Sequence, residues 1–101
     1  MNDYATTTHA EHLRLTILKL LAHGGGGYAA NESVIADGAE RLGFRVSRDK
    51  VRTEIAWLAE QGLVGIEQVE DLLVATLTSR GLEVAEGRTH VPGVKRPSPR
   101  P

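Results

Sequence analysis

The 101-residue chain contains no cysteine. Disulfide bridges and thiolate zinc sites are therefore excluded, and a cytoplasmic location is the simplest interpretation of this absence. Long hydrophobic runs are also missing. The most apolar stretch, residues 13–22, is interrupted by Arg14 and Lys19, whereas a membrane span needs about 18–20 uninterrupted apolar residues. Residues 1–4 are polar and acidic and lack the pattern of a secretory signal. We expect no membrane segment.

Proline is scarce and confined to one end, because all four prolines lie in residues 92–101. The hydrophobic content of 41% and the charged content of 25% are ordinary for a globular domain. The length allows one domain. We therefore expect a flexible N-terminal tail over residues 1–7, one folded domain over residues 8–87, and an extended, Pro-rich basic tail over residues 88–101 that buries little.

The first half of the chain carries two helix patterns. Thr8 and Glu11 fit a capping box, and the apolar spacing after them predicts a helix that ends at the glycines of residues 24–27. A short extended segment follows at residues 28–30. Asn31 can cap a second helix, which Gly43 ends. Its inward side chains are expected to be Val34, Ile35 and Leu42.

The second half predicts a helix, a hairpin and a last short helix. Ser47 can cap a helix over residues 48–61 that buries an apolar stripe at Val51, Ile55 and Leu58. Residues 63–67 and 72–77 read as two strands of a hairpin. Thr78 or Ser79 can cap the last helix. This order predicts a mainly α winged helix-turn-helix fold with a three-helix core, a small β-hairpin as the wing, and a short C-terminal helix.

Two segments carry a resemblance to known families. SRDKVRTEIAWLAEQGLV, residues 47–64, resembles the third helix and first wing strand of ArsR- and MarR-like regulators, and LTSRGLEVAEG, residues 77–87, is similar to their exit from the wing. Residues 10 to 100, including the closing VPGVKRPSP, resemble small ArsR-like winged-helix proteins of Mu-like phages and prophages. The resemblance implies a phage-encoded regulator of transcription, located in the cytoplasm of the bacterial host cell.

Basic residues gather around the third helix although the net charge is -1. Five cations and one acid lie in residues 41–52, and a helix of this kind can enter the major groove of double-stranded DNA. The predicted DNA contacts are Arg45, Ser47, Arg48, Lys50, Arg52 and Thr53, with candidate tail contacts at Lys95, Arg96 and Arg100. This hypothesis requires Arg48 and Arg52 to point outward, free of internal partners. A homodimer is the expected binding form.

The predicted wing favours an alternative. It carries Glu67, Glu70 and Asp71, which phosphate would repel, so the same fold can instead serve as a protein-interaction module, such as a phage accessory factor. Trp57 is expected at the core edge beside the wing, with an interface as the alternative. No spacing indicates a catalytic group or a cofactor, and His9 and His12 lack the further ligands that a metal needs. We therefore expect no enzyme and no metal site.

Overall fold

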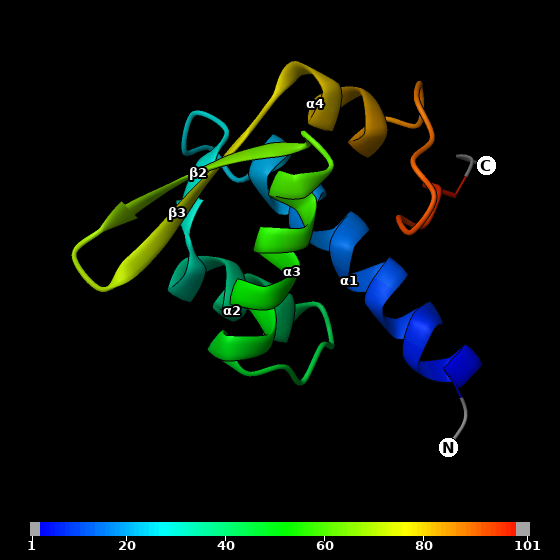
Figure 1. The fold of residues 1–101 in the computed structure, drawn as a ribbon, viewed down its shortest axis with the longest axis horizontal. Coiled ribbons are helices and arrows are strands. Elements are labelled where there is room, and N and C mark those ends of the chain that lie inside the picture. The colour runs from blue at the N-terminus through cyan, green and yellow to red at the C-terminus, as the bar shows by residue number, and fades with distance from the viewer. Residues whose placement is uncertain (1–2, 99–101) are drawn as a thin grey trace.

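The computed structural model describes residues 3–98. Over these residues the chain forms an α+β domain with four helices and a three-stranded antiparallel sheet (Figure 1). In chain order the elements are α1 (Asp3–His23), β1 (Ala29–Asn31), α2 (Glu32–Arg41), α3 (Arg48–Glu60), β2 (Val64–Val69), β3 (Leu72–Leu77) and α4 (Ser79–Ala85). This arrangement is compatible with the predicted winged helix.

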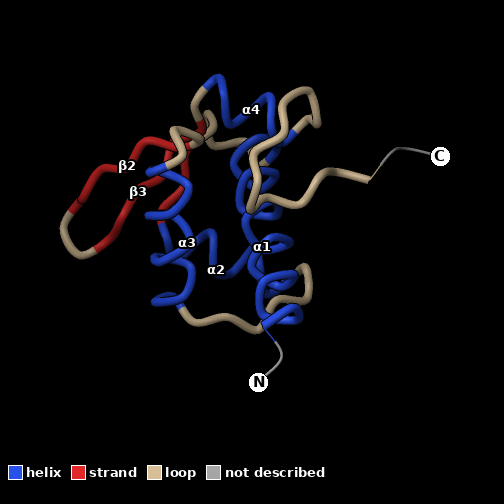
Figure 2. Tube along the Cα trace, turned by 45° about the vertical axis from the view of Figure 1, so that its right-hand side comes forward, coloured by secondary structure: helices blue, strands red, loops and turns tan. Residues whose placement is uncertain are grey.

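The sheet has the order β1-β3-β2. The β2–β3 hairpin pairs Val64 with Leu77 at its base and Val69 with Leu72 at its tip, which leaves a two-residue turn. Glu70 in that turn has a φ of 55°, the left-handed conformation that tight hairpin turns require. The hairpin projects from one side of the helices, and the C-terminal segment runs along α1 on the other side (Figure 2).

One hydrophobic core joins all the helices to the base of the hairpin. Its largest fully buried apolar side chains come from α1, α2, α3, the residue before β2 and the C-terminal segment: Leu13, Ile17, Leu18, Leu21, Ile35, Val51, Ile55, Leu58, Leu63 and Val94. The apolar stripes predicted for residues 13–21 and for α3 are confirmed. Within residues 3–98, no helix combines the length and the apolarity that crossing a membrane requires.

Three predicted helix caps are present. The side chain of Asn31 accepts a hydrogen bond from the Val34 amide at the start of α2. Ser47 accepts from the Lys50 amide at the start of α3, and Thr78 accepts from the Gly81 amide at the start of α4. Each cap satisfies an amide that has no partner within its helix, so the chain fixes where these helices begin.

Both predicted tails differ from the structure. Helix α1 begins at Asp3, so Thr8 and Glu11 lie inside a helix and do not cap it. At the other end, Val91 and Val94 are 4% and 2% exposed and join the core. The segment 91–95 is therefore packed on the domain despite the flanking prolines, and Gly93 lies against Arg14 of α1 and Trp57 of α3.

The predicted inward face of α2 is wrong in part. Ile35 is buried, but Val34 and Leu42 are 56% and 60% exposed. The core contacts of α2 come instead from Glu32, Ile35 and Ala39, which recur at the spacing of one helix face. Val34 lies one residue away from that face and Leu42 follows the end of the helix, so both side chains point outward.

Candidate nucleic-acid interface

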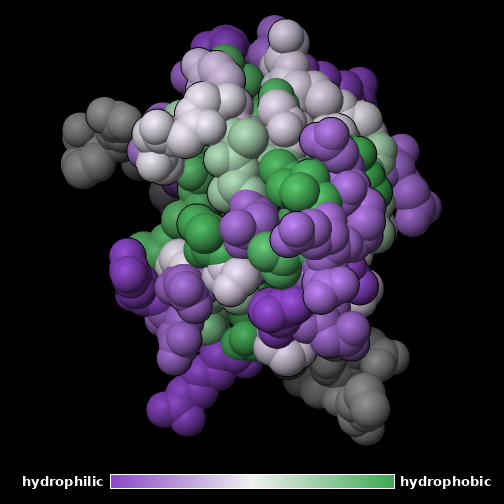
Figure 3. Space-filling view, turned by 90° about the vertical axis from the view of Figure 1, so that its left-hand side faces the viewer, coloured by the Kyte–Doolittle hydropathy of each residue, from purple (hydrophilic) through white to green (hydrophobic). Residues whose placement is uncertain are grey.

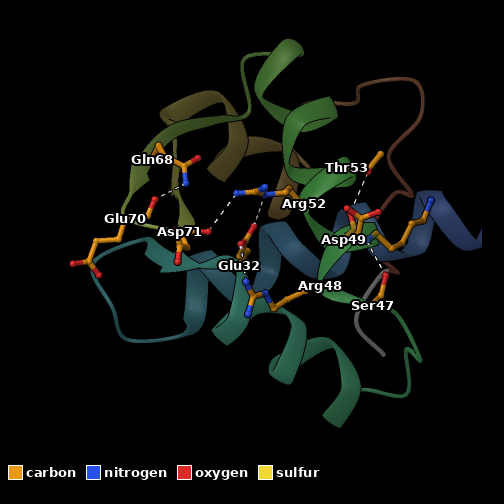
Figure 4. Close-up of polar contacts among 10 residues, drawn as sticks. Glu32, Ser47, Arg48, Asp49, Arg52, Thr53, Gln68, Glu70 and Asp71 are labelled. Carbon is orange, nitrogen blue, oxygen red and sulfur yellow. Dashed lines mark hydrogen bonds and ion pairs between the residues drawn. The ribbon is translucent and has the colours of Figure 1, made fainter.

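Helix α3 carries most of the predicted contact residues. Its apolar stripe faces the core, and the positions between the stripe residues face outward. Arg48 and Arg52 lie four residues apart on the side that faces the hairpin and the start of α2, as Figure 4 shows. Their side chains are 55% and 43% exposed. The predicted shared face of these two arginines is therefore present, and solvent reaches both.

Each of these arginines has an internal partner. The Nε–H of Arg52 donates to Oε2 of Glu32 at 2.9 Å, and Nη2 of Arg48 lies 3.5 Å from Oε1 of the same carboxylate (Figure 4). Glu32 itself is only 2% exposed. The requirement that the two arginines be free of internal partners is therefore not met. The contact of Arg48 lies at the limit of a hydrogen bond, and that of Arg52 is firm.

A second buried carboxylate holds Lys50. Nζ of Lys50 and Nε of Arg14 donate to the two oxygens of Glu54, each at 2.7 Å, and the Glu54 side chain is 3% exposed. Burial raises the pKa of Glu54, but the hydrogen bonds from Lys50 and Arg14 and their positive charges outweigh it, so the pKa lies below its ordinary value of 4.5. Glu54 is thus a carboxylate bridging α1 and α3.

The other predicted contacts on and near α3 divide into two kinds. The hydroxyl of Thr53 donates to the backbone oxygen of Asp49 at 3.1 Å, and the hydroxyl of Ser47 caps the helix, so both are engaged locally. Arg45, in the loop before α3, is exposed and forms no ion pair with the side chains of residues 7–98. Arg45 is therefore accessible to a ligand.

The charges of this region are layered. Two cations face each buried carboxylate: Arg48 and Arg52 surround Glu32, and Arg14 and Lys50 surround Glu54. The α3 cations of both clusters, Arg48, Lys50 and Arg52, keep 40–55% of their side chains exposed, whereas the side chain of Arg14 is only 17% exposed. The cations of α3 therefore reach solvent although they are paired, and the exposed acids Asp49 and Asp71 beside them offset part of their charge.

The hairpin supplies no cation to this surface. Glu67, Glu70 and Asp71 are exposed along it, and Nη2 of Arg52 lies 3.5 Å from the backbone oxygen of Asp71. A shallow depression of about 250 Å³ separates α3 from the hairpin, lined by Glu32, Arg48, Asp49, Arg52 and Asp71. The acidic hairpin expected from the sequence is present in the structure, and it lies beside the two arginines.

Trp57 of α3 is partly buried against the core. The guanidinium of Arg14 stacks over its ring, 3.9 Å from the ring centroid. Nη1 of Arg14 also donates to the backbone oxygen of Gly93 at 2.9 Å. The predicted position at the edge of the core is confirmed, and Arg14 and the C-terminal segment lie against the indole.

The predicted tail contacts have different outcomes. Lys95 and Arg96 are exposed, and the backbone amide of Lys95 donates to the oxygen of Glu11, so Lys95 lies along α1. Arg100 lies outside the described residues. At the N-terminal end, the ring of His9 packs edge-on against Phe44, with 5.5 Å between the centroids, which gives this histidine a packing contact.

Sequence reasoning missed Glu32, Glu54 and Arg14. The signal for the two acids was the helical period itself, because Glu54 lies between Val51 and Leu58 on the buried stripe of α3. Glu32 likewise precedes Ile35 by three residues on the buried face of α2. An acid on an apolar stripe needs a cationic partner when it is buried. That expectation would have pointed to the nearby cations.

Comparisons with known proteins place the chain in a family. No family model matches it. The protein gp26 of Escherichia phage Mu is 50% identical over 100 residues, which cover 99% of this chain and 98% of gp26. An uncharacterized protein of Haemophilus influenzae is 49% identical over 70 residues, which cover 68% of this chain and 67% of that protein. The predicted likeness to Mu-like phage proteins is confirmed, and the chain belongs to the family of the phage Mu protein gp26.

Proposed function

We propose that the chain is a winged-helix protein that binds double-stranded DNA through α3, and that it acts as an ArsR-like transcriptional regulator in Mu-like phages. One observation carries this proposal: the carboxylates of Glu32 and Glu54 are buried, whereas the three α3 cations that they hold keep 40–55% of their side chains exposed. A helix that presents exposed cations suits the polyanionic major groove. The element order is compatible with a winged helix.

The contacts of the arginines decide what kind of binding is proposed. A guanidinium has five N–H groups, and Arg52 directs two of its nitrogens to protein oxygens. Its remaining donors suit a phosphate oxygen. Arg48 has only the long contact to Glu32 and can turn toward a base edge. We therefore assign phosphate contacts to Arg45, Lys50 and Arg52, and we assign contact with a base edge to Arg48.

The acidic hairpin limits the affinity of this binding. Because phosphate repels carboxylates, Glu67, Glu70 and Asp71 keep the hairpin tip away from the DNA backbone. A few phosphate contacts per chain give binding that weakens steeply with salt, with a log–log slope of about -0.9 for each phosphate neutralised. A second copy on the same DNA would add contacts, which is the reason to propose a homodimer.

A protein-interaction module is the second candidate, favoured by exposed apolar residues on the hairpin. Ile66 and Val69 of β2 are each 47% exposed, next to the three hairpin acids. On the side from which the hairpin projects, apolar surface lies in several patches between hydrophilic areas (Figure 3). A partner with basic and apolar groups would match this surface.

The decisive experiment measures binding to a labelled random-sequence duplex and to fragments of phage Mu DNA by fluorescence anisotropy at low salt. The variant Glu32→Gln/Arg52→Gln keeps the net charge of the chain and replaces the ion pair with two amides. Arg48→Ala removes the proposed base contact. Arg80→Ala is the matched control, since Arg80 is an exposed cation of α4. Circular dichroism confirms that each variant is folded.

The expected result is that Arg48→Ala and the double variant weaken binding about tenfold or more, while Arg80→Ala changes it little. Wild-type affinity in both α3 variants would show that α3 is not the DNA-binding surface. Absence of binding to any duplex at low salt would exclude the proposal and leave the protein-interaction module.

A further inference from the structure

Helix α2 exposes an apolar surface that the core does not use. Leu42 and Val34 have the highest exposure among the large hydrophobic residues that are exposed in residues 7–98, at 60% and 56%. Val34 lies in the first turn of α2, and Leu42 directly follows its last residue. An exposed pair of this kind at the two ends of one helix marks a contact surface more strongly than a single exposed side chain does.

A groove runs beside this helix. It has a volume of about 500 Å³ and is bounded by the end of α1, the glycine loop, β1 and the outer face of α2, with Leu20, Val34, Asp37, Gly38 and Arg41 among its lining residues. A side chain at Gly38 would meet Leu20, with 2.9 Å between its Cβ and Cδ2 of Leu20. The missing side chain lets α1 and α2 lie close together, and Leu20 covers the middle of this face between Val34 and Leu42.

Two side chains of opposite charge line the same groove. Asp37 and Arg41 are both exposed and are four residues apart, so they lie on one side of α2. Neither forms an ion pair with the side chains of residues 7–98. The outer face of α2 thus presents an apolar residue at each end, Leu20 over Gly38 in the middle, and one charge of each sign.

From this pattern we infer that the outer face of α2 binds the same face of a second copy of this chain, with the two helices antiparallel about a twofold axis at Gly38. A twofold interface uses one patch on both subunits, so the patch must complement itself. Val34 and Leu42 are equally far from Gly38 along the chain. An antiparallel arrangement therefore sets Val34 of one copy against Leu42 of the other, twice.

The charges fit the same arrangement. With Gly38 at the centre, Asp37 of one copy comes opposite the turn that holds Arg41 of the other, and the reverse pair forms at the symmetric position. Leu20 of α1, which lies over Gly38, adds an apolar side chain near the axis. A parallel pair would instead place the Asp37–Arg41 edges of the two copies on opposite sides of the interface, where they could not pair.

The interface is small, since α2 has ten residues and is about 15 Å long. We therefore expect a reversible, concentration-dependent dimer, as for interfaces below about 1,200 Å². The surface contains none of the α3 residues assigned to DNA. Self-association can therefore be tested independently of DNA binding.

The test is sedimentation velocity of the full chain over a concentration series up to about 1 mM, the weak end of measurable association. Asp37→Arg and Arg41→Asp each place like charges opposite one another in a homodimer. Mixed in equal amounts, the two variants restore both opposite-charge pairs in a heterodimer. Val34→Glu removes an apolar contact, and Val69→Glu on the hairpin is its matched control. Because all four positions are exposed, folding is preserved, which circular dichroism checks.

We expect wild type and Val69→Glu to dimerise alike. Asp37→Arg, Arg41→Asp and Val34→Glu should each raise the dissociation constant about tenfold or more, and the mixture of the two charge variants should recover the wild-type value to within a few-fold. A monomeric wild type over the whole series overturns the inference. So do single charge variants that associate like wild type, or a mixture that associates no better than either component.

Discussion

The Nε–H of Arg52 on α3 donates to Oε2 of Glu32 at the start of α2, and the two atoms lie 2.9 Å apart. The carboxylate is buried, whereas 43% of the arginine side chain is exposed. A buried carboxylate loses its hydration and must be compensated by hydrogen bonds and positive charge. Arg52 therefore serves the packing of α2 against α3, whatever its outer N–H groups bind.

Replacing Arg52 should consequently cost more stability than replacing its neighbour. We expect Arg52→Ala to lower the free energy of unfolding by about 1.5–3 kcal/mol, the range for a hydrogen bond to a charged group. Arg48→Ala should cost less than about 1 kcal/mol, because its contact is long and its side chain more exposed. Urea unfolding followed by circular dichroism measures both.

The control is Glu32→Gln in the Arg52→Ala background. Removing the charge that Arg52 neutralises should recover part of the loss, since an amide is less costly to bury than an unpaired carboxylate. Equal losses for Arg52→Ala and Arg48→Ala would contradict the different roles assigned to the two arginines.

Local signals in the sequence were enough for much of the fold. Asn31, Ser47 and Thr78 act as caps as predicted, because a cap depends on residues within one turn of each other. The buried stripe of α3 follows from the 3.6-residue period in the same way. These features need no knowledge of what lies on the other side of the helix.

The candidate site was less predictable because its contacts join distant parts of the chain. The partners Arg14 and Glu54 are forty residues apart in sequence, and no spacing rule links them. The same holds for Val91 and Val94, whose burial depends on the rest of the core and not on the prolines beside them. The cations of α3 were found, but not the two carboxylates beneath them, since composition treats acids as surface residues.

Acid should weaken the fold through Glu54. Its pKa is lowered in the folded chain, so the carboxylate adds stability above its ordinary pKa, and this stability is lost as the pH falls through the lower folded value. We expect the free energy of unfolding to decrease from about pH 5 to pH 3. Denaturant titrations across this range measure the decrease.

Glu54→Gln isolates this contribution. The variant should be less stable than wild type at pH 7, because Lys50 and Arg14 lose their anion. Its stability should also change less between pH 5 and pH 3, since the titrating group is gone. An acid dependence as steep as that of wild type would mean that other carboxylates, and not Glu54, carry the effect.

Gly81 in α4 should tolerate no side chain. An added Cβ would overlap the backbone oxygen of Leu63 and lie 2.7 Å from Cδ1 of Leu77. Since that oxygen belongs to the backbone, relief requires α4 to move, and we expect Gly81→Ala to cost about 3 kcal/mol or more. Gly65→Ala is the matched control: a Cβ there meets nothing within 4 Å and should change stability by less than about 0.5 kcal/mol. Similar melting temperatures for the two variants would contradict the close contact at α4.

The C-terminal segment should shield Trp57, the only tryptophan of the chain. Gly93 has a φ of 100°, and a Cβ there would lie 2.7 Å from Cζ2 of the indole, so Gly93→Ala must push the segment off the ring. Acrylamide should then quench the fluorescence of Trp57 more strongly than in wild type. Pro92→Ala alters an exposed neighbour and should leave quenching unchanged. If acrylamide quenches Trp57 equally in Gly93→Ala and in wild type, the segment does not cover the indole in solution. The signal is unambiguous because the chain has one tryptophan.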